Sequence, residues 1–378
     1  MRFDGVNRAK ENAYFGILVC RRNGTLPPAV RSFYRRLALL GRRLGVTVLV
    51  FAPEWTDRWM RNVYAYAYDP ERSAWFRDWF PFPRLIYDRS FFRTGEERRK
   101  HRRFLEKLAR LPGVTLLGLG LGGKLEVYRH LQNAGAFAAV LPETEPYTGP
   151  GTLRRWLEKY DAVMLKPQNG MQGKLVFHLR RLSGERYAAW GRSPANRPVG
   201  LRFPDLGSLL RWADRRLTAG RPFLIQKRLS LTTRNGEPFD IRALVQKDGR
   251  GQWSFTGAAA RIGPAGAPTS NLHGGGRAEE AGTFLANLFG EPAATDILGT
   301  IRETALAVPP ALELRHGPLV ELGIDFGVEP DGRIWLLEVN SKPGRTSFLQ
   351  FPDKSVKIAA VASPIRYARY IFDRHLGG

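Results

Sequence analysis

The sequence is short of cysteine and of long apolar runs, and each shortage excludes a class of protein. Cys20 is the single cysteine in 378 residues, so an internal disulfide is impossible and a buried thiol in a reducing compartment is expected. No apolar run approaches the length of a membrane span, and the polar start "MRFDGVNRAKEN" has no apolar signal-peptide segment behind it. These features predict a cytoplasmic protein with no membrane partner.

Acidic residues are also scarce, because 35 Asp and Glu stand against 59 Lys and Arg, which gives a net charge of +24. The basic residues are 47 arginines and 12 lysines, and the arginines are spread in pairs along helical stretches such as "RSFYRRLALLGRRLG". This distribution leaves two interpretations open, a solvated Arg-rich surface or a patch that binds a polyanion. Because lysine is rare, each lysine in an apolar setting is informative.

The order of apolar patterns predicts an α/β protein in three parts. Residues 14–53 are typical of a strand, a helix and a second strand, and the pattern changes at Gly122-Gly123. The polar, Arg-rich stretch that follows the middle strands predicts one helix, around "LGSLLRWADRRL". We therefore expect an N-terminal α/β domain at 1–120, a small α+β lobe at 121–225 and a strand-rich C-terminal lobe at 226–378.

The segment "LVELGIDFGVEPDGRIWLLEVN" predicts a β-hairpin, because "EPDG" is a turn signal between two strands. With the turn centred on its Pro-Asp pair, Asp325 lies opposite Leu336. Alternation along the strand then puts Glu338 and Asn340 on the same face as Asp325. Two carboxylates and an amide are hard oxygen ligands that suit Mg²⁺. The alternative, a solvated polar face, fits poorly with Leu336 on that face.

Lys166 ends the apolar strand "AVMLKP" and precedes a loop that contains Gly170 and Gly173. A lysine in this position reaches a phosphate, and the glycines let backbone N–H groups approach the same phosphate. The order of residues in a Walker A loop is absent, and an ordinary glycine-bearing turn remains the alternative.

A third group of polar residues follows in "DIRALVQKDGRGQWSFTGAAARIGPAGAPTSNLHGGG". Asp240 and Arg242 share a strand face, and Arg261 ends the next strand. Arginines at strand ends suit bidentate recognition of a carboxylate or phosphate. Asn271 and His273 lie in the glycine-rich loop beyond, where a lone histidine is more typical of a polar loop residue than of a metal ligand.

In their order along the chain, these motifs, together with "FLIQKRL" and the closing "LLEVNSKPG", resemble the ATP-grasp superfamily. Residues 14–370, including "FPFPRLIYDRSFFR", are most similar to the endospore coat-associated YheC/YheD-type ATP-grasp proteins of spore-forming bacteria. The resemblance implies an N-terminal α/β pre-ATP-grasp domain followed by two α+β lobes that clamp ATP. It also implies ATP and Mg²⁺ as cofactors.

The resemblance implies a role for individual residues. It assigns nucleotide binding to Lys124, Lys166, Gly170, Gly173, Gln226, Lys227, Leu229, Asp240 and Leu336, with Leu336 beneath the adenine. It assigns Mg²⁺ binding to Asp325, Glu338 and Asn340, catalysis to Arg261, Asn271 and Lys166, and substrate contacts to Arg242, His273 and Arg345. Departures from the family's pattern are Lys227 in place of an acid, Leu175 in place of a second loop glycine and Thr269 in place of an arginine.

The implied activity is the ATP-dependent joining of a carboxylate to an amine through an acylphosphate. An acidic amino acid or acidic peptide is the expected substrate, with spore coat components as candidate partners and a cytoplasmic, spore-associated location. One alternative is an ATP-binding spore coat-associated protein or kinase-like enzyme without ligase activity, and another is a polyanion binder. No nucleic-acid-binding module is recognised, so nucleic acid is the least favoured partner. The oligomeric state is left open.

Overall fold

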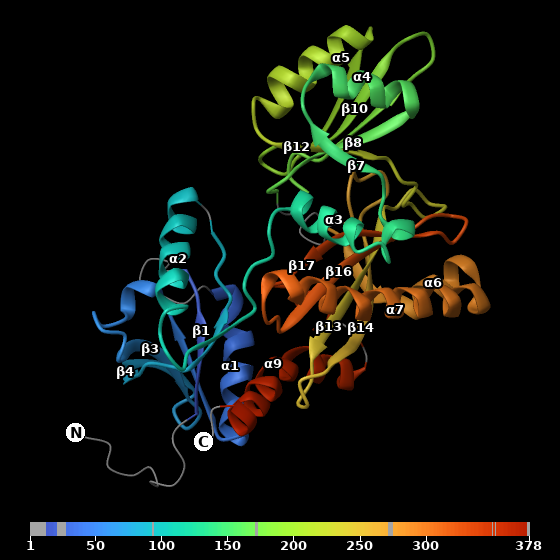
Figure 1. The fold of residues 1–378 in the computed structure, drawn as a ribbon. Helices are drawn as coiled ribbons and strands as arrows, with labels where there is room; N and C mark the ends of the chain where they lie inside the picture. Colours follow the sequence, from blue (N-terminus) through green and yellow to red (C-terminus); the bar gives the residue numbers. More distant parts are fainter. Residues whose placement is uncertain are drawn as a thin grey trace.

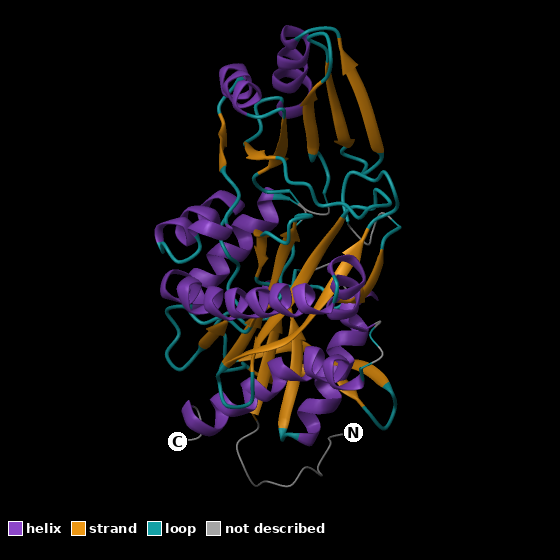
Figure 2. Ribbon diagram, turned by 90° about the vertical axis from the view of Figure 1, so that its right-hand side faces the viewer, coloured by secondary structure: helices purple, strands orange, loops and turns teal. Residues whose placement is uncertain are grey.

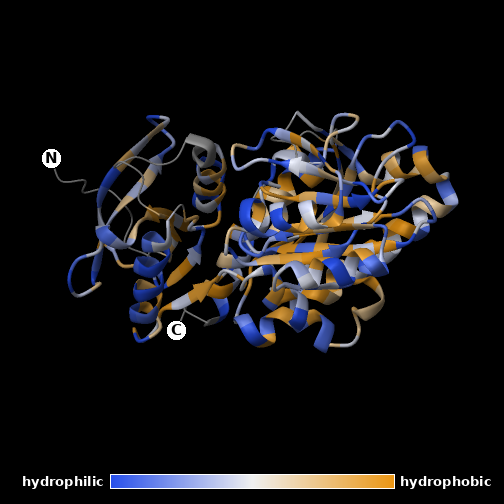
Figure 3. Ribbon diagram, turned by 90° about the horizontal axis from the view of Figure 1, so that it is seen from above, coloured by the Kyte–Doolittle hydropathy of each residue, from blue (hydrophilic) through white to orange (hydrophobic). Residues whose placement is uncertain are grey.

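The computed structural model describes residues 13–20, 28–92, 94–170, 173–270, 275–349, 351 and 353–375. Three β-sheets follow one another along the chain, and Figure 1 shows them as an N-terminal domain, a middle lobe and a C-terminal lobe. Apolar residues concentrate in the central strands, and apolar and polar residues alternate along the outer helices (Figure 3). The mixed α/β architecture expected from the sequence is confirmed.

The N-terminal domain is built on a six-stranded sheet in the order β4-β3-β2-β1-β5-β6. Its strands are β1 (Ala13–Leu18), β2 (Val46–Phe51), β3 (Asn62–Asp69), β4 (Ala74–Pro81), β5 (Leu85–Asp88) and β6 (Thr115–Leu117). Helices α1 (Pro28–Arg43) and α2 (Gly95–Leu108) pack on opposite faces. The β3–β4 hairpin lies in a stretch for which the sequence pattern predicted no strands.

The middle lobe is a second six-stranded sheet in the order β11-β10-β9-β8-β12-β7, antiparallel throughout. Its strands are β7 (Thr144–Tyr147), β8 (Ala162–Pro167), β9 (Phe177–Arg181), β10 (Tyr187–Arg192), β11 (Pro198–Phe203) and β12 (Phe223–Lys227). Helices α4 (Pro150–Lys159) and α5 (Leu206–Trp212) cover one face, and a π-helical turn (Ala213–Thr218) extends α5. In the part of the chain that the structure describes, no helix covers the other face (Figure 2).

The C-terminal lobe contains an antiparallel sheet in the order β15-β14-β13-β16-β17. Its strands are β13 (Phe239–Lys247), β14 (Trp253–Ile262), β15 (Arg277–Glu280), β16 (Glu321–Val328) and β17 (Ile334–Asn340). One face packs on α3 (Lys124–Asn133), α6 (Ala281–Phe289) and α7 (Glu291–His316). The opposite face packs on α8 (Thr346–Leu349) and α9 (Lys354–His375).

Two segments cross the divisions expected from the sequence. Helix α3, placed in the small lobe by the sequence pattern, packs in the core of the C-terminal lobe through Val127 and Leu131. Helix α9 returns to the N-terminal domain, where Ile365 and Phe372 join the core beside α1 (Figure 1). Boundaries at 120/121 and 225/226 stay predictions. Among the helices that the structure describes, none is long and apolar enough to cross a membrane.

Candidate active site

The β16–β17 hairpin brings the three predicted metal ligands together through a β-bulge. Asp325 pairs with Glu338, and Gly323 pairs with Asn340, so the two carboxylates and the amide project from the same face. The register shifts between Asp325 and Phe326, which gives β17 one additional residue. The predicted pairing of Asp325 with Leu336 is therefore wrong, although the grouping of the three oxygen donors agrees with the prediction.

The bulge also changes the position of Leu336. Leu336 pairs with Phe326 and is 3% exposed in the core beneath α7, so its predicted place on the face of the metal ligands is wrong. Its neighbour Leu337 lines a cavity together with Glu338 and Asn340. Leu336 reaches the edge of an adjoining cavity, and its predicted contact with adenine stays a prediction.

Two lysines face the carboxylates from other elements. Lys124, at the start of α3, donates to Glu338 Oε1 at 2.6 Å, and Lys166, on β8, donates to Gln226 Oε1 at 3.0 Å. Gln226 in turn donates to Thr144 Oγ1 at 2.6 Å. Burial, together with the positive charge of Lys124, lowers the pKa of Lys166 to about 8. An anionic ligand placed between the two lysines would therefore be stabilised by both.

A buried cluster of two aspartates and two arginines lies beside the hairpin. Arg242 donates two hydrogen bonds to Asp325, while Arg261 joins Asp240 at 2.6 Å and Asp325 at 2.9 Å. Burial by itself would raise the pKa of both carboxyl groups. In Asp325 the charges of Arg242 and Arg261 outweigh burial and lower its pKa to about 2. Asp240 keeps a raised pKa, although Arg261 and Ser270 oppose burial. Asp325 is thus ionised but shared between two arginines.

The loop after Lys166 has the strained conformation expected where backbone approaches a ligand. Gly173 lies at φ +71°, and Leu175 at φ +60°. The positive φ of Leu175 costs about 1 kcal/mol for a residue with a Cβ. Gly170 lines both cavities and Gly173 lines one of them. Residues 171 and 172 between them lie outside the described residues.

The segment between the two lobes is placed at the same cavity. Gln226 lines both cavities, and Leu229 is buried at the wall of one. Lys227 instead turns its ammonium group over the rings of Tyr160 and Trp335, at 5.9 and 5.8 Å. Its predicted contact with the nucleotide would therefore come from its backbone.

The other predicted residues lie in different places relative to the cavities. Arg345 is 6% exposed, donates to Glu321 and lies over the ring of Phe33, so its position does not support contact with substrate. Arg242 lines the smaller cavity beside Arg261. Asn271 and His273 fall outside the described residues, and their roles stay predictions.

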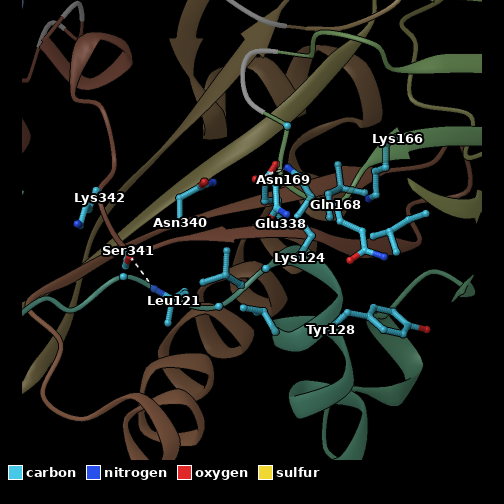
Figure 4. A pocket seen from close by; sticks show the side chains of 18 of the residues that line it. Leu121, Lys124, Tyr128, Lys166, Gln168, Asn169, Glu338, Asn340, Ser341 and Lys342 are labelled. Carbon is cyan, nitrogen blue, oxygen red and sulfur yellow. Dashed lines mark hydrogen bonds and ion pairs between the residues drawn. The ribbon is translucent and has the colours of Figure 1, made fainter. Parts of the chain in front are cut away.

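The described residues enclose two adjoining cavities of about 690 and 450 Å³. Their walls share Lys124, Lys166, Gln226, Glu338 and Asn340, and Figure 4 shows Lys124, Asn169 and Glu338 meeting at the centre of the larger one. The larger cavity extends to the N-terminal domain, whose loop between β5 and α2 supplies part of the wall.

Sequence reasoning missed the residues that hold the N-terminal domain against this cavity. Asp88, at the end of β5, accepts from Lys342 at 2.8 Å and contacts His101 Nε2 at 3.1 Å. Lys342 lies two residues after Asn340, so this ion pair fixes the loop that follows the predicted metal ligands. The acid at the end of "RLIYD" was the available signal, because polar groups at strand ends often face a site.

Comparison with known proteins places the chain among ATP-grasp proteins. It is 28% identical over 341 residues to endospore coat-associated protein YheC of Bacillus subtilis (strain 168), covering 90% of this chain and 92% of YheC. It is 24% identical over 346 residues to endospore coat-associated protein YheD of the same organism, covering 90% and 74%.

Solved structures show the same fold at low identity. The D-cycloserine synthetase DcsG matches with a TM-score of 0.54 at 18% identity, over 95% of this chain and 99% of that chain. The ATP-grasp ligase PsnB, complexed with precursor peptide PsnA2 and AMPPNP, matches with a TM-score of 0.52 at 15% identity, over 95% and 100%. The model of the YheC/D-like ATP-grasp family matches residues 113–371, and the chain therefore belongs to this family.

Proposed function

We propose that the protein is an ATP- and Mg²⁺-dependent ligase that joins a carboxylate to an amine through an acylphosphate. The observation that carries the proposal is the pairing of Asp325 with Glu338 across the β16–β17 bulge, with Asn340 on the same face. Lys124 and Lys166 face these donors across one cavity. Oxygen donors opposite lysines are the groups that a metal-bound triphosphate requires.

The residues present fit such a ligand. Asp325, Glu338 and Asn340 supply hard oxygen donors suited to Mg²⁺. The lowered pKa of Lys166 reflects burial and uncompensated positive charge, which a phosphate would relieve. Arg242 and Arg261 occupy the carboxylate of Asp325, so both guanidinium groups lie within reach of an anion that binds next to it.

The chain's own groups then act by position and charge. When bound, ATP would supply the phosphoryl group and Mg²⁺ would neutralise its charge. Lys124 and Lys166 would hold the phosphates, and Arg261 would stabilise negative charge that develops on the substrate carboxyl oxygen. The N-terminal domain and the loop at Lys342 would close the larger cavity against water, which protects an acylphosphate from hydrolysis.

The substrate class and setting follow from charge and from the relatives. A net charge of +24 favours an acidic amino acid or acidic peptide, and the solved ligase PsnB is described with a precursor peptide. The names of YheC and YheD support an association with the spore coat. A spore-associated location and spore coat partners are therefore part of the proposal.

A second candidate is a nucleotide-binding protein without ligase activity, including a kinase-like enzyme. The observation in its favour is that Asp325 is fully engaged by Arg242 and Arg261. Such an arrangement is stable without a metal. This candidate predicts that the protein binds ADP but that adding an amine does not cause release of phosphate.

The test is ADP and phosphate release in the presence of ATP, Mg²⁺ and pools of carboxylates and amines. We expect release to require both a carboxylate and an amine, and Glu338→Gln to lower it about 100-fold, as for loss of a metal-site group. Glu303→Gln, an exposed change on α7, is the matched control. Heavy-oxygen label in the carboxylate should appear in the released phosphate, and phosphorylated substrate without label transfer would instead identify a kinase.

A further inference from the structure

The face of the middle sheet that carries no helix presents a row of arginines and alanines. Apolar residues of β8 to β11, such as Leu165 and Leu179, point to the face covered by α4 and α5. The alternate residues therefore point to the open face. On that face Arg202 pairs across β10 with Ala188, and Ala188 pairs with Arg180.

The row continues to the cavity. Arg180 pairs with Ala162 on β8, and the backbone N–H of Arg228, just after β12, donates to the Ala162 carbonyl at 3.4 Å. The sheet thus presents Arg202, Ala188, Arg180, Ala162 and Arg228 in sequence across its strands. Successive arginines lie two strand spacings apart, which is about 10 Å, and the alanines leave the surface between them low.

Among the described residues, these three arginines have no hydrogen-bond or ion-pair partner for their side chains. Arg180, Arg202 and Arg228 are exposed, and none forms a hydrogen bond or ion pair through its side chain with another residue that the structure describes. Burial and the charge of Arg180 lower the pKa of Arg228, in keeping with like charges close together. Three unpaired guanidinium groups in a row favour an anionic ligand.

The surrounding charge has the same sign. Residues 144–228 contain 17 Lys and Arg against 6 Asp and Glu, so this lobe carries 11 of the chain's 24 net positive charges. The row is distinct from the rest of the lobe's positive charge, because many of the lobe's other arginines lie on its helices or have partners. Arg155, for example, pairs with Glu145.

The row is continuous with the candidate active site. Arg228 lines the smaller cavity together with His178 and Trp190, which occupy the neighbouring row of the same face. Lys166, Asp325 and Glu338 line the same cavity. A ligand lying along the arginines therefore ends at the groups proposed to act on a carboxylate.

We propose that this row binds an acidic peptide in the polyproline II conformation, in which side chains three residues apart lie on the same side of the chain, so that carboxylates at this spacing meet successive arginines. A polyproline II chain advances about 3.1 Å per residue, so three residues span about 9 Å, close to the spacing of the arginines. Guanidinium groups bind carboxylates in bidentate fashion. Trp190 and His178 carry the only rings of these two rows, fewer than a single-stranded nucleic acid would use to stack successive bases. The inference rests on the proposed function only in naming this peptide as the substrate.

The test is the binding of a fluorescently labelled oligo-glutamate peptide of about ten residues, long enough to span the row, measured by anisotropy on the full chain without ATP. We expect Arg180→Gln/Arg202→Gln to weaken binding roughly tenfold, as for the loss of two charge pairs. Arg154→Gln/Arg215→Gln removes the same charge from exposed helical positions of the same lobe, and we expect it to change binding less than about twofold.

Equal losses in the two variants, or no binding by the unaltered protein, would overturn the proposal. Tighter binding of an oligo-uridylate of equal charge through Arg180 and Arg202 would assign the row to nucleic acid instead. Affinity for ADP should be the same in both double variants, because none of the four substituted arginines lines either cavity. Peptide binding without any turnover would refute the ligase and leave this site standing.

Discussion

At the scale of single residues, the protonation state of Lys166 should depend on whether a phosphate is bound. Its ammonium group lies in the cavity with Gln226 as its hydrogen-bond partner and with Lys124 nearby. Burial and the charge of Lys124 lower its pKa to about 8. The free protein therefore begins to lose this proton just above neutral pH, whereas a bound phosphate would favour the protonated form.

This state predicts a pH dependence of nucleotide binding. Affinity for ATP should fall as the pH rises through about 8, because only protonated Lys166 attracts phosphate. Isothermal titration between pH 6.5 and 9.5 measures this fall, together with proton uptake on binding in the upper part of the range. Lys166→Arg, which keeps its charge throughout, should show a flatter profile. If the wild type and Lys166→Arg showed the same pH profile, Lys166 would not be the group that titrates.

At the scale of elements, the β16–β17 hairpin places the predicted metal ligands through a close contact that only glycine permits. A Cβ on Gly323 would lie 2.8 Å from Cβ of Pro343 and 3.2 Å from a guanidinium nitrogen of Arg242. Gly323 pairs with Asn340, so the loop that follows the predicted metal ligand packs directly over this backbone. The hairpin and the loop therefore form one unit.

Substitution of this glycine tests the packing. Gly323→Ala should lower the thermal unfolding midpoint by an amount equivalent to about 1–3 kcal/mol, because overpacking forces Pro343 away. Gly299→Ala at an exposed position of helix α7, where an added Cβ meets no atom within 4 Å, should raise the midpoint by the equivalent of about 0.5–1 kcal/mol. Thermal unfolding followed by circular dichroism measures both. Changes of the same sign in the two variants would count against the close contact.

At the scale of the whole molecule, the N-terminal domain and the C-terminal lobe meet in a buried polar network centred on Glu321. Tyr87 and Arg89 reach its Oε1 from the N-terminal domain, at 2.5 and 3.0 Å. Arg345 and Gln246 reach its Oε2 from the C-terminal lobe. Burial raises the pKa of Glu321, but Arg345 and Arg89 outweigh it and lower the pKa.

Loss of this carboxylate should separate the domains. Glu321→Gln leaves Arg89 and Arg345 buried without an anion, which we expect to cost about 3 kcal/mol and to expose the joint to limited proteolysis. Because the folded pKa lies below the unfolded value near 4.5, this contribution is complete above pH 4.5 and is lost as the pH falls further. The thermal midpoint of the wild type should therefore fall towards that of Glu321→Gln in acid.

The control for this experiment is Glu303→Gln on the exposed face of α7. It removes the same charge without touching the network, so its midpoint should stay within about 1 kcal/mol of the wild type. If Glu321→Gln were as stable as this control at neutral pH, the network would not hold the domains together.

The sequence by itself determined the class of fold and most of the candidate site. The order of motifs from "LKP" to "LLEVNSKPG" identified the ATP-grasp family, because the residues that carry this site are local signals at strand ends. Alternation along β17 grouped Glu338 with Asn340, and the turn at "EPDG" brought Asp325 to them. The scarcity of lysine directed attention to Lys166. Each of these inferences depends on neighbours within a few residues.

Only the tertiary structure decided the rest, because it depends on contacts between distant segments. A bulge moved Leu336 into the core and Leu337 to the cavity, which a count of residues across a turn cannot reveal. Arg345 is buried because Glu321, 24 residues earlier, needs a counter-charge. Strands β10 and β11 lie in a polar, Arg-rich stretch, and their alternation is short, as in Val199, Leu201 and Phe203 of β11. Their pairing is what aligns Arg180 with Arg202.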